Sequence, residues 1–107
     1  MSLEYIQGDI PDDMILGVEV NGVAENIDDA TQVNLHWVKP DDTETLVALI
    51  EEDFALGTVK RVWEAGDTDL AGAHRGRVVV TRSGGELNTF PTDGGWFYWW
   101  VNPSSPL

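Results

Sequence analysis

Short apolar stretches separated by turn residues run along the whole chain, and this spacing limits the fold more than any other feature. Gly, Pro, Asn and Asp recur about every 8–12 positions, while no segment shows a clear 3.6-residue apolar stripe. The expected strands cover residues 14–21, 32–39, 46–51, 58–64, 74–82, 86–90 and 96–101. This pattern predicts an all-β fold, an antiparallel β-sandwich of about seven strands formed by residues 1–107 as one domain, with a short Pro/Ser tail at the C-terminus.

The best helix candidate, residues 41–54, is expected to be a strand or an irregular connection instead. Val47 to Ile50 form a continuous apolar run of strand length, and the surrounding residues give no helical periodicity.

The charge of the chain is strongly one-sided, with 19 acidic and 6 basic residues and a net charge of -13. Repulsion from phosphates therefore argues against nucleic acid as a partner. The acidity is consistent with solubility, with a salt-rich host, or with docking onto a basic partner surface. There is no apolar run long enough to span a membrane, and the N-terminal residues do not resemble a signal peptide.

Groups suited to catalysis are scarce, so we expect no enzyme activity and no catalytic residues. The chain lacks cysteine, its serines lie at the termini or in a turn, and His36 and His74 have no nucleophile nearby in sequence. His74 is expected to have a structural role.

Metal and cofactor binding are not expected either. Zinc needs three or four His, Cys or carboxylate ligands, and the chain offers two distant histidines and no cysteine. Aspartate pairs such as Asp67 and Asp69 could contribute oxygen ligands to calcium, but they lack the spacing of a calcium loop, and aspartate commonly stabilises turns.

The aromatic strand near the C-terminus gives the strongest functional signal. Its alternation places Trp96, Tyr98 and Trp100 on one face and Phe97 and Trp99 on the other. A surface strand of a sandwich needs only one apolar face, so one of these two sets must be covered by something else. All five residues are therefore candidate partner-binding residues, and we expect docking through an aromatic edge strand, because Trp and Tyr often anchor interfaces. Coverage by the chain's own loops and stacking on carbohydrate remain alternatives.

Trp37 and Trp63 have a simpler interpretation. Each ends an alternating run, so both are expected in the core.

The segment from Val62 to Trp100 also resembles the N-terminal domain of phage baseplate upper proteins. The likeness is carried by an Asp/Thr-rich turn, a Gly-x-aromatic position, an alternating strand, a glycine turn and a Thr-Phe-Pro element. The matching positions are Gly66 to Asp69, Gly72 to His74, Val78 to Thr81, Thr89 to Pro91, and Asp93-Gly94. Gly8-Asp9, Asn21-Gly22 and the strand from Val33 to Val38 extend the likeness toward the N-terminus.

This resemblance implies an immunoglobulin-like sandwich that attaches one component of a virus particle to another. It implies a non-enzymatic structural protein of a tailed phage, found in the virion after synthesis in the host cytoplasm. The implied partners are other virion proteins, such as the major capsid, neck or tail protein, in a multi-copy homo-oligomeric assembly. Capsid decoration, a head–tail connector and a baseplate role are all open, and a carbohydrate- or receptor-binding module is the alternative.

Overall fold

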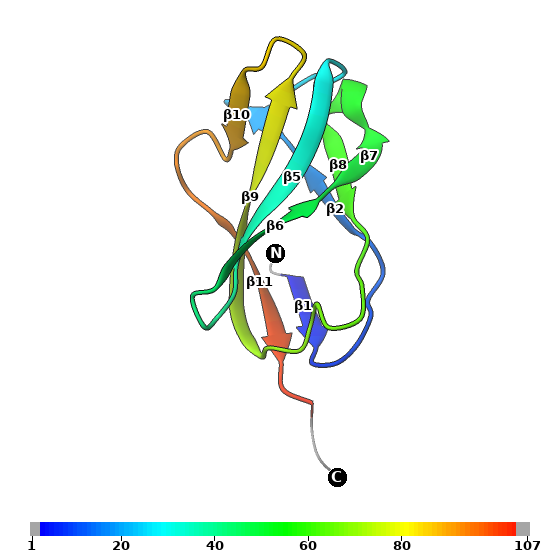
Figure 1. The fold of residues 1–107 in the computed structure, drawn as a ribbon, viewed down its shortest axis with the longest axis vertical. Helices are drawn as coiled ribbons and strands as arrows, with labels where there is room; N and C mark the ends of the chain where they lie inside the picture. The colour runs from blue at the N-terminus through cyan, green and yellow to red at the C-terminus, as the bar shows by residue number, and fades with distance from the viewer. Residues whose placement is uncertain (1–2, 105–107) are drawn as a thin grey trace.

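The protein is an all-β sandwich, as the spacing of strands and turns predicts. A computed structural model describes residues 3–104, and Figure 1 shows the strands arranged in layers with no α-helix among them. The part of the expected Pro/Ser tail from 105 to 107 lies outside the described residues.

The larger sheet has six strands and carries the features that matter for function. Its order is β1-β11-β9-β5-β6, and β10 pairs with the remaining length of β9. The bounds are β1 Leu3–Ile6, β5 Ala30–Val38, β6 Glu44–Ala48, β9 Gly72–Arg82, β10 Leu87–Phe90 and β11 Phe97–Asn102. All pairs are antiparallel except β1 with β11, which is parallel.

The smaller sheet covers the upper half of the larger one and has the order β2-β8-β7 (Figure 1). Its strands are β2 Met14–Gly17, β7 Ile50–Asp53 and β8 Thr58–Arg61. A single 3-10 turn, η1 Phe54–Leu56, connects β7 to β8.

A two-residue hairpin follows the smaller sheet's first strand. β3 Glu19–Val20 pairs with β4 Val23–Ala24 through the turn at Asn21 and Gly22. Both turn residues have positive φ, 53° and 79°, which is the conformation that Asn-Gly favours in a tight hairpin. The predicted turn is therefore confirmed at these two residues.

The core lies between the two sheets and is filled by inward residues of every long strand. Val33, Leu35 and Trp37 alternate inward along β5, as the sequence pattern predicts. Trp37 and Trp63 are 1 % and 4 % exposed, so their expected place in the core is confirmed.

Three elements differ from the expected strands. The segment expected at residues 14–21 is divided between β2 and β3, which belong to different sheets, because the chain leaves the smaller sheet at the buried Val18. The segment expected at residues 46–51 is divided between β6 and β7, which belong to different sheets, because the chain crosses between the sheets at the buried Leu49. The N-terminal strand β1 was not predicted, since its four residues only become a strand by pairing with β11.

Candidate binding surface

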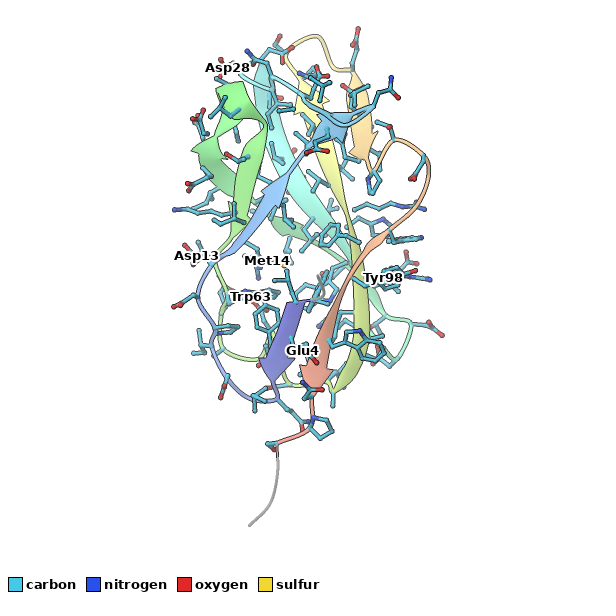
Figure 2. All side chains as sticks on the ribbon, turned by 180° about the vertical axis from the view of Figure 1, so that it is seen from behind. Glu4, Asp13, Met14, Asp28, Trp63 and Tyr98 are labelled. Carbon is cyan, nitrogen blue, oxygen red and sulfur yellow. The ribbon has the colours of Figure 1, made fainter. Side chains whose placement is uncertain are left out.

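The two faces of β11 have different environments. Trp99 and Val101 are 0 % and 1 % exposed, and Phe97 is half-buried beside them, whereas Tyr98 and Trp100 are 53 % and 46 % exposed. Figure 2 shows Tyr98 projecting from β11 on the side away from Met14 and Trp63. The structure thus divides the five candidate partner-binding residues, because Trp99 cannot reach a partner and Phe97 faces inward.

The strand itself is not at an edge of the sheet. β11 lies between β1 and β9, so its backbone is hydrogen-bonded on both sides. The expectation of docking through an aromatic edge strand is therefore wrong, since β1 covers that edge. Only the side chains of β11 remain available to a partner.

The inward aromatic residues are fixed by a buried histidine. His74 stacks on Trp99 with ring centroids 5.6 Å apart and an angle of 15° between the planes. Trp37 Nε1 donates a hydrogen bond to His74 Nδ1 at 2.9 Å, and His74 Nε2 lies 2.8 Å from the carbonyl oxygen of Leu70. Because Nδ1 accepts, Nε2 must carry the proton and donate to Leu70, which defines a neutral tautomer.

Burial lowers the pKa of His74, and the hydrogen bond to Leu70 opposes this only in part. The imidazole is therefore held neutral, with both ring nitrogens already occupied. This supports the structural role expected for His74 and leaves no free nitrogen for a proton-transfer step or for a metal.

The outer face of the larger sheet gathers aromatic and cationic side chains. Tyr98 is paired in register with Arg75 on β9, and Trp100 with Ala73. Arg77, two residues further along the same face of β9, is paired with His36 on β5. We call the surface formed by Arg75, Arg77, Trp96, Tyr98 and Trp100 the Arg–Trp surface.

Trp96 occupies the centre of the Arg–Trp surface. The guanidinium carbon of Arg77 lies 3.8 Å from the centroid of the indole, and that of Arg75 lies 4.6 Å from it. The ring of His36 is 5.3 Å away. Each guanidinium interacts favourably with the negative face of the indole ring, so Trp96 is covered by two cations instead of by a loop.

Arg77 also holds the loop that carries Trp96. Its Nε donates to the carbonyl oxygen of Gly95 at 3.0 Å, and Nη2 donates to that of Gly94 at 2.6 Å. The Arg77 side chain makes two backbone hydrogen bonds and one ring contact. We therefore infer that Arg77 positions the loop, because these N–H donors are not free to bind a ligand.

Arg75 is different because its buried Nε has no hydrogen-bond acceptor among the described residues. No carboxylate within residues 3–104 forms an ion pair with Arg75 either. A guanidinium offers five N–H donors in a rigid plane. Arg75 is therefore the group on this surface best suited to bind an anion.

Most other cations are already paired with carboxylates. Arg61 Nη2 lies 2.9 Å from Asp67 Oδ2, Arg82 Nη1 lies 2.6 Å from Asp29 Oδ1, and Lys60 Nζ lies 3.8 Å from Asp13 Oδ2. Asp67, considered above as a calcium ligand, is thus already used in an ion pair. Within the described residues, no group of three or more His, Cys, Asp or Glu side chains is arranged to hold a metal ion.

Sequence reasoning identified the aromatic strand but missed the arginines. The alternation along residues 74–82 placed Arg75 and Arg77 on one face, and that was the available signal. Their stacking on Trp96 could not be read from the sequence because Trp96 belongs to an irregular loop between β10 and β11.

Comparisons with known proteins support the fold of this chain but do not assign it to a family. No family model matches the chain, and no curated protein does. The crystal structure of CopC from Methylosinus trichosporium OB3b is similar, with a TM-score of 0.55 and 12 % sequence identity, over 99 % of this chain and 88 % of that chain. At this identity the likeness concerns the sandwich fold alone. No helix in the range from 3 to 104 is long and apolar enough to cross a bilayer.

The comparison corrects the expected function and location. A virion structural role, with capsid, neck, tail or baseplate attachment and a place in the virus particle, is not supported, because no family model and no curated protein matches the chain and a solved structure similar to nearly its whole length is that of CopC. The expectation was wrong for a physical reason: strand lengths and Gly, Asp and Pro turns recur in unrelated β-sandwiches. The resemblance to the baseplate family stays a prediction.

Proposed function

We propose that this protein is a non-catalytic interaction module whose Arg–Trp surface binds an acidic segment of a partner protein. The observation that carries the proposal is the half-buried Arg75, which lies over Trp96 and has no anionic partner within residues 3–104.

The composition of the surface supports protein binding. Trp, Tyr and Arg are the residues most enriched among those that dominate the binding energy of interfaces. Here Tyr98 and Trp100 are large, exposed and held on a regular strand. A surface fixed by strand pairing loses little conformational entropy when it binds.

The distribution of charge supports an acidic partner. The chain has a net charge of -13, so an acidic peptide is repelled from most of its surface. Arg75 and Arg77 lie together two residues apart on one strand, without a neutralising carboxylate in residues 3–104. An acidic segment that reaches them gains the charge-assisted hydrogen bonds that Arg75 lacks.

A peptide titration followed by NMR tests the proposal. The probe is acetyl-Asp-Glu-Leu-Glu-Asp-amide, and the matched probe replaces each acidic residue with lysine. We expect the acidic peptide to shift the amide signals of residues 73–77 and 96–100, and the lysine peptide to leave them unchanged. Binding should weaken as salt is added, because exposed charges are screened.

Variants of the protein complete the test. Arg75→Ala should weaken binding of the acidic peptide by about tenfold, as expected for the loss of a central interface residue. Arg75→Lys should restore part of the affinity, since it keeps the charge but loses the planar stack. Lys60→Ala removes one positive charge from the other sheet and serves as the matched control. Equal weakening by Lys60→Ala and Arg75→Ala would contradict a specific surface.

A further inference from the structure

A second candidate surface has none of its lining residues in common with the Arg–Trp surface. A cleft of about 480 Å³ lies between β2 and the segments that end β10 and begin β11. Its apolar part is formed by Leu16, Val78, Phe90 and Phe97. The volume is within the range of sites that bind ligands or side chains.

The strand that borders this cleft has a free edge. β2 pairs with β8 alone, so one row of its backbone N–H and C=O groups has no partner strand in the described part of the chain. No residue of β8 lines the cleft, whereas Leu16 and Gly17 of β2 do, so the cleft lies on the unpaired side of β2.

The residues of this edge strand, Met14 to Gly17, include neither the charged side chains nor the proline that often protect edge strands. Ile15 among them is 51 % exposed. Such an edge is a template on which another extended segment can form hydrogen bonds.

The charges around the edge determine which segment fits. Glu19 and Asp93 line the cleft together with its apolar residues, and none of the lining residues is Lys, Arg or His. Neither carboxylate forms an ion pair with a described residue. Opposite charges on neighbouring strands attract, and like charges repel.

The same charges oppose pairing between two copies of this chain. If β2 of one copy paired antiparallel with β2 of another, with Met14 opposite Gly17, Asp12 would lie opposite Glu19 at both ends. These like charges destabilise the symmetric pair. A partner strand flanked by lysine or arginine instead places positive charges beside these carboxylates, and opposite charges on neighbouring strands attract.

We infer that the free edge of β2 and the cleft beside it bind an extended segment of a partner protein, with one large apolar side chain and a Lys or Arg on each side of it. The partner backbone pairs with Met14 to Gly17, its apolar side chain enters the cleft between Leu16 and Phe90, and its cations reach Glu19 and Asp93.

The probe for this inference is the peptide acetyl-Lys-Thr-Phe-Thr-Lys-amide, because strand alternation puts Phe and both Lys residues on one face. Added to the full chain, it should shift the amide signals of Ile15, Gly17 and the residues lining the cleft. Replacing both lysines with glutamate should weaken binding about tenfold. Replacing Phe with Ala, or methylating the backbone nitrogens that face β2, should abolish it.

Variants of the chain separate the site from general charge attraction. Glu19→Gln with Asp93→Asn should weaken binding of the lysine peptide, and the Asn side chain keeps the oxygen that accepts from the Gly95 amide. Glu52→Gln with Glu64→Gln removes two exposed charges elsewhere and should have little effect.

Equal binding of the lysine and glutamate peptides would overturn the inference. So would unchanged Ile15 and Gly17 signals, or equal weakening by the two double variants. Shifts confined to Arg75, Arg77, Tyr98 and Trp100 would also overturn it, since they would place the peptide on the Arg–Trp surface.

Discussion

The inner and outer faces of the six-stranded sheet both carry aromatic side chains, but the groups that surround these side chains differ between the two faces. On the inner face, Trp99 is packed against the neutral His74 and the Trp37 ring. On the outer face, Trp96 lies between two arginines, and Tyr98 and Trp100 are exposed. Aromatic rings are thus buried where neutral groups surround them, and they remain at the surface where cations surround them.

The largest expected effect is on the inner face. Trp99→Ala should lower the free energy of unfolding by about 3–5 kcal/mol, because it leaves a large cavity beside Trp37 and His74. Trp100→Ala, one residue away on the outer face, should cost about 1 kcal/mol or less. Urea denaturation of both variants measures the difference, and equal losses would show that the outer face is packed as tightly as the inner one.

Gly76 is closely surrounded by side chains of the inner face, including Trp99. A Cβ at Gly76 would lie 2.8 Å from Leu35 Cδ1 and 2.9 Å from Phe97 Cζ. Gly76→Ala should therefore lower the free energy of unfolding by about 1–3 kcal/mol through overpacking. Gly84→Ala is the control, since no atom lies within 4 Å of the Cβ that it would add. A neutral effect of Gly76→Ala would mean that the inner face adjusts freely.

The pH dependence of stability should distinguish the two histidines. The pKa of His74 is lowered in the folded protein, so the unfolded chain binds a proton first as pH falls. Its contribution to stability is then full above the unfolded pKa of about 6.5 and declines as pH falls toward the folded value, by at most about 1.4 kcal/mol per pH unit.

Denaturation curves at several pH values between 7.5 and 5 test this. His74→Phe should remove this part of the pH dependence, whereas His36→Gln, on the outer face, should retain it. A pH profile unchanged by His74→Phe would show that His74 does not cause the loss.

The smallest effects on stability are expected among the outer arginines. Arg77→Ala should cost about 1 kcal/mol and speed amide exchange in residues 91–96, because it removes two hydrogen bonds to Gly94 and Gly95. Arg75→Ala should change the free energy of unfolding by about 0.5 kcal/mol or less, while weakening the binding of the acidic peptide. Hydrogen exchange and urea denaturation measure both. A larger cost for Arg75→Ala than for Arg77→Ala would reverse their proposed roles.

Some features of this protein could be predicted from local sequence alone. Alternation places Trp37 in the core, and Asn21-Gly22 forms the hairpin turn, since each depends on neighbouring residues. Strand β1 could not be predicted in this way because Leu3 to Ile6 become a strand only through contact with residues 99–102.

The sequence by itself determined that the last strand has two aromatic faces, and only the tertiary structure decided which one is buried. Alternation separates Trp99 from Tyr98 and Trp100, but it does not assign an inside. The assignment follows from the register with β9, which pairs Trp99 with His74 and Tyr98 with Arg75. A neutral His74 that is hydrogen-bonded on both nitrogens is tolerated in the core, whereas an unpaired arginine is not. The Arg–Trp surface therefore results from strand pairing, because pairing brings together residues that are more than 20 positions apart in the sequence.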